Sequence, residues 1–139
     1  MRCYDWLDKI ITTLDAGINT VFAEQVAARP IPGEGIIMSD LPTPLKRQSQ
    51  GLMRVNHIGE VCAQALYRGQ LTFAKGETLR EMLQQASLEE TDHLAWTHQR
   101  LKELETHRSR LNLFWYVNAF SIGMLASWLG DSWSLGFVE

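Results

Sequence analysis

The chain has 139 residues, of which 45% are hydrophobic, and this length and composition allow one domain with a buried core. Its formal net charge is −3 and it contains no run of basic residues, so its charge gives no indication of a nucleic-acid partner. No segment shows the sustained alternation of β-branched and polar residues that is typical of strands, and the sequence therefore predicts an all-α protein.

The two cysteines, Cys3 and Cys62, lie too far apart in the sequence to form a short metal or redox motif. Their scarcity is typical of a reducing, intracellular compartment. The N-terminus has no apolar signal core, and Asp5, Asp8 and Asp15 argue against an Arg-rich transit peptide. We therefore expect a protein of the bacterial cytoplasm.

Residues 1–28 predict one amphipathic helix, running from about Tyr4 to Ala28, because their apolar side chains recur at helical spacing. These side chains are Leu7, Ile10, Ile11, Leu14, Ile18, Val21, Phe22 and Val26. Most apolar stripes of this kind face a core, so we expect this helix to cover the helical hairpin that follows. Lying on a membrane is the less common use of such a stripe.

Residues 29–42 predict a linker, because proline and glycine are concentrated there. The prolines and glycines of this segment are Pro30, Pro32, Gly33, Gly35 and Pro42. Thr43 and Pro44 come next, and they suit the N-cap and the first residue of a helix. The linker is long enough to span a helical bundle.

Residues 43–107 predict a helical hairpin whose turn lies at residues 75–78. Gly76 suits the left-handed residue that follows a helix, and Thr78 with Glu81 predicts a capping box at the start of the second helix. A turn this short makes the two helices antiparallel, so residues equally distant from the turn lie opposite each other.

Glu60, Glu90 and His93 are the candidate metal ligands of this hairpin. At 1.5 Å per residue, Glu60 and Glu90 lie roughly 24 and 21 Å from Gly76, nearly level across the two helices. His93 follows Glu90 by one turn on the same helix face. One glutamate on one helix with a Glu-x-x-His pair on its neighbour is half of the ligand set of a di-iron carboxylate bundle.

The sequence around Glu60 predicts that its helix is buried, because the run 55–67 is apolar or small on most sides. A buried, ionised carboxylate requires a partner or a metal ion. A salt bridge to Arg54 or Arg68 is the alternative partner for Glu60. For His57, one turn earlier, a role in orienting a ligand and a role as a satisfied core histidine are equally open.

Glu90 and His93 fall within the apolar periodicity of the second arm, so we expect both to point inward. The apolar residues are Leu79, Met82, Leu83, Ala86, Leu94, Leu101 and Leu104. Three polar neighbours are expected to face water or to orient a metal-bound imidazole. They are Glu89, Asp92 and His98.

The segment 111–130 carries no charged residue and has the length of a membrane span. Polar and small residues dilute it, and aromatic rings lie near both ends, as in an interfacial helix. These residues are Asn112, Asn118, Ser121, Gly123 and Ser127, and the rings of Trp115, Tyr116, Trp128 and Trp133. We favour an interfacial or partly lipid-facing helix, with a true span and a purely buried helix as the alternatives.

Five strings in this order resemble the demethoxyubiquinone hydroxylase family of ubiquinone biosynthesis. They are residues 54–70, 89–96, 115–116, 130–131 and 134–138. The resemblance runs from about residue 45 to the end of the chain, and its strings are long and uncommon. Ile58 is a mild departure, since a smaller residue is expected between the histidine and the glycine, and it leaves the ligand positions untouched.

This resemblance implies a ferritin-like antiparallel helical bundle with two iron ions, which uses molecular oxygen and an external reductant to hydroxylate the ring of demethoxyubiquinol. Glu60, Glu90 and His93 fall on the family's first three metal ligands and are the candidate catalytic residues, with Glu90 as the candidate bridging ligand. The family's further Glu and second Glu-x-x-His come from a later helical hairpin, and the next ligand is expected just past Glu139. Residues 108–139 are expected to hold the hydrophobic helix and the start of the next helix. We therefore expect a bundle that is incomplete at its C-terminus and a chain that is inactive as a monomer.

The resemblance also implies partners and a location. We expect a polyprenyl quinol substrate and peripheral attachment to the cytoplasmic side of the bacterial cell membrane, with other ubiquinone-biosynthesis proteins or a second copy of the chain as further partners. Two other functions are open: an iron-binding protein of ferritin or rubrerythrin type, and a non-catalytic, membrane-associated helical module.

Overall fold

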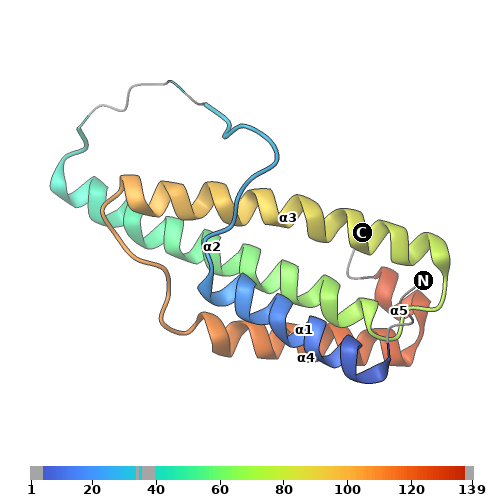
Figure 1. Cartoon of the computed structure of the whole chain (residues 1–139). Coiled ribbons are helices and arrows are strands. Elements are labelled where there is room, and N and C mark those ends of the chain that lie inside the picture. Colours follow the sequence, from blue (N-terminus) through green and yellow to red (C-terminus); the bar gives the residue numbers. More distant parts are fainter. Residues whose placement is uncertain (1–4, 34, 36–39, 137–139) are drawn as a thin grey trace.

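The computed structural model describes residues 5–33, 35 and 40–136, so Cys3 and Glu139 lie outside the described residues. Within these ranges all regular structure is helical, and the all-α prediction is confirmed. The helices are α1 (Trp6–Phe22), α2 (Thr43–Leu71), α3 (Glu77–Glu103), α4 (Asn112–Leu129) and α5 (Asp131–Leu135). Figure 1 shows α2 running between α3 and α4, with α1 lying along α2 and α4.

Two clusters of buried apolar side chains hold the helices together. The first joins all four long helices through Val21, Val61, Ala65, Leu94 and Tyr116. The second lies near the turn between α2 and α3 and contains Ala74, Leu79 and Leu83. In α3, the second helix of the hairpin, and directly after it, the apolar face predicted from the sequence is largely buried. Leu79, Leu83, Leu94, Leu101 and Leu104 are buried, whereas Met82 is exposed.

Two glycines allow the backbones of α2 and α4 to touch. A Cβ atom on Gly69 would lie 2.2 Å from the carbonyl oxygen of Phe120, and a Cβ on Gly123 would lie 2.2 Å from the carbonyl oxygen of Leu66. Both distances are far below van der Waals contact, so only glycine fits at these two positions. This close contact makes α2 and α4 one unit, against which α1 and α3 pack.

The turn between α2 and α3 differs from the predicted one. Gly76 has a φ of −73° and is the N-cap of α3, so it is not left-handed, and no side chain forms the predicted capping box of Thr78 and Glu81. Asp131 at the start of α5 holds this turn instead, since its carboxylate accepts hydrogen bonds from the amides of Lys75 at 3.2 Å and Gly76 at 2.8 Å. A residue 55 positions further along the chain thus determines the shape of this turn.

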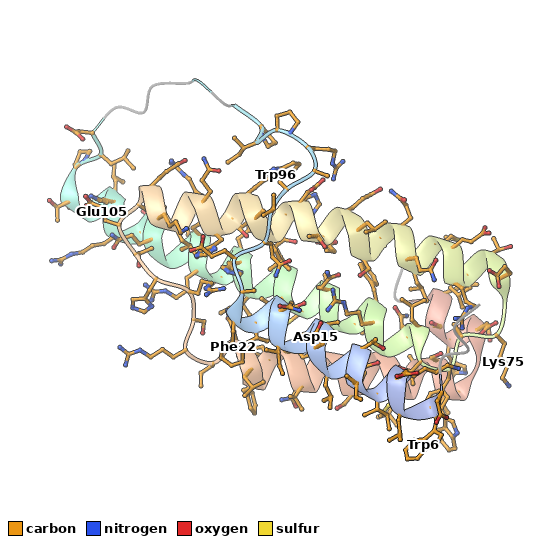
Figure 2. All side chains as sticks on the ribbon, viewed as in Figure 1. Trp6, Asp15, Phe22, Lys75, Trp96 and Glu105 are labelled. Atoms are coloured by element: carbon orange, nitrogen blue, oxygen red, sulfur yellow. The ribbon has the colours of Figure 1, made fainter. Side chains whose placement is uncertain are left out.

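The first helix is shorter than predicted. Asp5 and Asp8 form a capping box at its start, and it ends at Phe22 (Figure 2) rather than near Ala28. Arg108 accounts for this end, because its guanidinium donates to the carbonyl oxygens of Ala23 at 3.0 Å and Phe22 at 3.1 Å. The second helix begins within one residue of the predicted position, with Pro42 instead of Thr43 as its N-cap.

The prediction that the apolar stripe of α1 covers the hairpin is wrong. Leu7, Ile10, Ile11, Leu14, Ile18 and Phe22 are each about half exposed or more. The buried face of α1 contains Gly17, Thr20 and Val21 instead. Arg68 of α2 sets this rotation, because one of its nitrogens donates to the carbonyl oxygen of Ala16 at 2.5 Å and to the hydroxyl of Thr20 at 3.0 Å.

The fourth helix, α4, confirms the prediction that the uncharged segment 111–130 is helical. One face, which includes Tyr116, Gly123 and Ala126, is buried, while Phe114 and Trp128 are exposed. The alternative of a purely buried helix is therefore wrong. Among the described residues, no helix combines the length and apolarity that a membrane crossing requires.

Candidate metal centre

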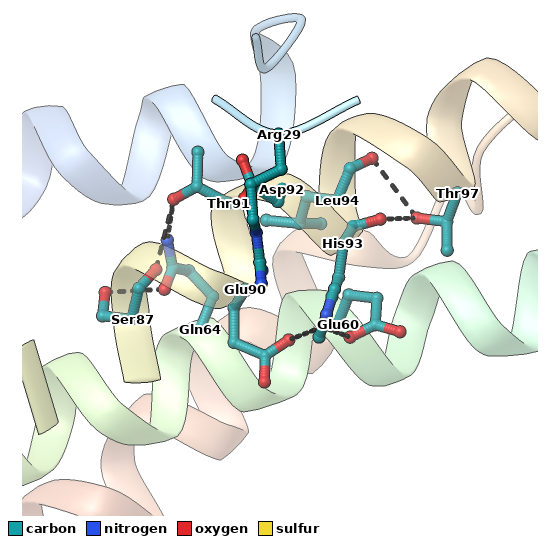
Figure 3. Close-up of polar contacts among 10 residues, drawn as sticks. All are labelled: Arg29, Glu60, Gln64, Ser87, Glu90, Thr91, Asp92, His93, Leu94 and Thr97. Carbon is teal, nitrogen blue, oxygen red and sulfur yellow. Dashed lines mark hydrogen bonds and ion pairs between the residues drawn. The ribbon is translucent and has the colours of Figure 1, made fainter. Parts of the chain in front are cut away.

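Glu60, Glu90 and His93 converge at the middle of the α2–α3 hairpin (Figure 3). The Nδ1 atom of His93 lies 3.1 Å from Oε2 of Glu90 and 3.7 Å from Oε2 of Glu60. One ligand atom from each of the three residues lies within 4.8 Å of the other two. The structure thus brings together all three of the residues that the sequence proposed as ligands.

The two carboxylates of this group repel each other. The pKa of Glu60 is raised from 4.5 to about 8, first by burial, then by a hydrogen bond with Glu90 and by the charge of Glu90. A buried pair of carboxylates in this arrangement favours binding either a proton or a cation. A divalent cation between them would offset the repulsion between the two ionised carboxylates.

The donor set fits iron. Two carboxylates and one imidazole suit divalent iron, and the separation of their ligand atoms allows one ion to reach all three. The side chains of Glu60 and Glu90 are 19% and 14% exposed, and that of His93 is 39% exposed. The site is therefore open to solvent on the His93 side.

The arginines that were the alternative partners of Glu60 bind elsewhere. Arg54 donates to the carbonyl oxygen of His107 and to the hydroxyl of Thr106, and Arg68 donates to α1. No ion pair between Glu60 and an arginine occurs in the described part of the chain, so the salt-bridge alternative is wrong. The negative charge of the group is not neutralised by a nearby guanidinium.

A hydrogen-bond network next to the ligands ties the two helices together. The side-chain amide of Gln64, one turn after Glu60, donates to the hydroxyl of Thr91 at 3.1 Å, and the hydroxyl of Ser87 donates to the amide oxygen of Gln64 at 2.7 Å. Gln64 is 1% exposed, so these bonds are shielded from water. This network sets the relative height of α2 and α3, and hence of Glu60 and Glu90.

The four polar neighbours named from the sequence have different environments. Glu89 is exposed, and its carboxylate accepts a hydrogen bond from Gln85. Asp92 is buried and binds the segment after α1, so the expectation that it faces water or the imidazole is wrong. His57 is buried near His98, at 6.0 Å between ring centroids, and burial lowers its pKa to about 4. Neither ring nitrogen of His57 has a hydrogen-bond partner among the described residues, so it is not a satisfied core histidine.

Tyr67 is a polar residue near the carboxylates that the sequence reasoning missed. The pKa of its hydroxyl is raised by burial and then by the negative charges of Glu90, Glu60 and Glu89. Tyr67 follows Glu60 by two helical turns, so the two residues share a face of α2. This spacing is a signal from which Tyr67 could have been found.

Comparison with known proteins identifies relatives of the chain. Residues 47–139 match the family described as "Ubiquinone biosynthesis protein COQ7". A curated protein of Nitrosomonas eutropha, named 3-demethoxyubiquinol 3-hydroxylase, is 48% identical over 132 residues, which are 95% of this chain and 64% of the relative. Proteins of the same name from Azoarcus sp. and Coxiella burnetii are each 51% identical, over 94% and 99% of this chain and 64% of each relative.

The chain therefore spans a little less than two thirds of the length of these relatives. No solved structure matches the chain.

Proposed function

The chain belongs to the COQ7 family of ubiquinone biosynthesis proteins, and from this membership we propose that it acts as an oxygen-dependent monooxygenase that hydroxylates the ring of demethoxyubiquinol. The observation that carries this proposal is the convergence of Glu60, Glu90 and His93. Curated relatives named 3-demethoxyubiquinol 3-hydroxylase support it.

In the proposed mechanism these three residues bind iron. When bound, the iron supplies the oxygen chemistry, with electrons from an external reductant. Glu60 approaches from α2, and Glu90 and His93 approach from α3. The three residues supply one Glu and one Glu-x-x-His, which is half of the ligand set of a two-iron centre. The chain's own task is to hold these donors at a set separation and to leave the His93 side open.

The other two functions have less support. A non-catalytic helical module whose glutamates and histidine are ordinary surface charges would not bring Glu60, Glu90 and His93 together in a half-buried group. An iron-binding protein of ferritin type would share the ligands, but its function requires no exposed apolar face such as that of α4. The names of the curated relatives also favour the hydroxylase.

In a version of the chain with the full length of its relatives, we expect Glu90→Ala or His93→Ala to abolish hydroxylation and to lower the iron content of the purified protein. Each change removes a ligand atom from a group in which all three ligand atoms lie close together. Glu89→Ala is the matched control, because Glu89 is the neighbouring glutamate on the same helix and is exposed. It should keep most of the iron and most of the activity.

Iron content by elemental analysis and turnover of a demethoxyubiquinol analogue, with oxygen and a reductant, test this proposal. An unchanged iron content in Glu90→Ala would reject the assignment of the metal ligands. Full iron content without turnover in the unaltered full-length version would instead favour the iron-binding alternative.

We further propose that the substrate is a polyprenyl quinol and that the protein attaches peripherally to the cytoplasmic side of the bacterial cell membrane. The support is the exposed apolar surface of α4, where Leu113, Phe114, Val117, Leu125 and Trp128 are each about half exposed or more. A polyprenyl chain is soluble in a bilayer and not in water. Other ubiquinone-biosynthesis proteins and a second copy of the chain are further candidate partners for this surface.

Replacing Phe114 and Trp128 together with serine should release the protein from liposomes, because membrane binding at an interface scales with the apolar area that is buried. These side chains are 56% and 69% exposed. The matched control replaces Leu52 and Val55, which are 64% and 67% exposed on α2, with serine. Co-sedimentation with liposomes measures the effect. Full co-sedimentation of a folded Phe114→Ser/Trp128→Ser protein would show that another surface binds the membrane.

A further inference from the structure

The segment that follows α1 crosses α3 beside the candidate metal centre (Figures 1 and 3). Asp92 holds this segment with both of its carboxylate oxygens. Oδ1 accepts a hydrogen bond from the backbone amide of Ala28 at 2.6 Å, and Oδ2 accepts one from Nε of Arg29 at 2.6 Å. The side chain of Asp92 is only 7% exposed, and the hydrogen bond from Arg29 is the main cause of its lowered pKa.

Arg29 also binds Trp96, one turn further along α3. Its carbonyl oxygen accepts a hydrogen bond from the indole nitrogen of Trp96 at 3.2 Å, and its guanidinium carbon lies 5.4 Å from the centroid of the Trp96 ring. This distance is within the range of a cation–π interaction. Arg29 thus connects the residue before His93 with the residue three positions after it.

Trp96 in turn packs against the imidazole of His93. The two ring centroids lie 5.4 Å apart, with 45° between the ring planes. The side chain of His93 is 39% exposed, and the Trp96 ring lies against the imidazole on one side. A Trp96 ring held in place by Arg29 restricts the rotation of the His93 ring.

We propose that Arg29 is a positioning residue for His93, acting through Trp96 and anchored by Asp92. This inference rests on the proposed role of His93 as a metal ligand. Three contacts, with Asp92, with the Trp96 indole nitrogen and with the Trp96 ring face, converge on this one side chain and its backbone. Residues around a metal site that orient a ligating histidine contribute to metal affinity without touching the metal.

Arg29→Gln tests the proposal, with Lys102→Gln as the matched control. Lys102 also ties α3 to the segment after α1, through a 2.7 Å ion pair with Glu24, but it lies away from the His93 ring. The first readout is the NMR signals of the His93 ring protons in metal-free protein, which sense the nearby Trp96 ring. The second is the affinity for Co²⁺, followed by its visible absorption.

For Arg29→Gln we expect shifted His93 ring signals and a Co²⁺ affinity roughly tenfold weaker, the lower end of the effect of losing an orienting partner. Lys102→Gln should match the unaltered protein in both readouts. Asp92→Asn, which removes the charge that anchors Arg29, should change both readouts in the same direction as Arg29→Gln. Circular dichroism identifies any variant that fails to fold.

Unchanged His93 signals in a folded Arg29→Gln protein would overturn the proposal, and so would shifted signals with an unchanged Co²⁺ affinity. Equal effects of Arg29→Gln and Lys102→Gln would also overturn it. The loss of any contact between α3 and the segment after α1 would then explain the result, without a specific role for Arg29. Failure of the unaltered protein to bind Co²⁺ would contradict the proposed function instead. The His93 signals of the metal-free variants would then still decide whether Arg29 positions the ring.

Discussion

Glu60→Gln is expected to stabilise the metal-free protein at pH 8 while abolishing its metal binding. The pKa of Glu60 is raised from 4.5 to about 8 by burial and by Glu90. Between these two pH values the unfolded chain has lost the Glu60 proton, whereas the folded protein retains it. The folded state then binds more protons than the unfolded state, so its stability falls as the pH rises.

The stabilising contribution of the Glu60 proton is therefore complete below about pH 4.5 and is lost as the pH rises through about 8. Glutamine has nearly the shape of protonated glutamate and does not titrate. Glu60→Gln should thus remove this part of the pH dependence. At pH 8 we expect the variant to melt about 5 °C above the unaltered protein, on the order of 1 kcal/mol.

Thermal unfolding of metal-free protein at pH 5 and pH 8 measures this difference. Glu89→Gln is the control, since Glu89 is exposed and should leave the pH dependence unchanged. Addition of Co²⁺ or iron should stabilise the unaltered protein at pH 8 but not Glu60→Gln, because a ligand that binds only the folded state raises its stability. The same loss of stability between pH 5 and pH 8 in both proteins would show that Glu60 is ionised in the metal-free fold.

Gly123→Ala is expected to be among the most destabilising single changes in the chain. The new methyl group would lie 2.2 Å from the carbonyl oxygen of Leu66 and 3.1 Å from the backbone nitrogen of Gln70. Both neighbours are backbone atoms of α2 and cannot rotate away as a flexible side chain can. The two helices would have to separate, at a cost of about 3 kcal/mol or more.

Urea unfolding tests this expectation, with Gly51→Ala as the control. Gly51 lies in α2, and a Cβ atom there would meet nothing within 4 Å. Alanine should therefore stabilise the helix at this position by about 0.5–1 kcal/mol, because glycine is a poor helix former. If Gly123→Ala were no more harmful than Gly51→Ala, the contact between α2 and α4 would not be as close as the structure shows.

The convergence of Glu60, Glu90 and His93 could be predicted from the sequence, because it depends on local rules. The rise of a helix places residues that are equally far from a short turn at the same height, and a spacing of three keeps Glu90 and His93 on one face. This prediction was correct although the turn itself was predicted wrongly. Glu60 lies 11 residues before the end of α2 at Leu71, and Glu90 lies 13 residues after the start of α3 at Glu77, so the two ligands remain nearly level.

The helix within segment 111–130 could also be predicted from the sequence, because its length and lack of charge are local properties. The face of this helix that is buried could not be predicted. The α4 sequence is apolar nearly all round, so periodicity does not distinguish its sides. The contact of Gly123 with α2 decides the buried face.

The sequence by itself determined that the chain is helical and the level at which Glu60, Glu90 and His93 lie, since both follow from residues a few positions apart. Only the tertiary structure decided what α1 buries and what Asp92 binds. The apolar stripe of α1 is a regular amphipathic pattern, yet Arg68 of α2 rotates it outward by binding the Ala16 carbonyl. Asp92 binds Arg29 across 63 positions of the chain, and a partner that distant leaves no signal in the local sequence pattern.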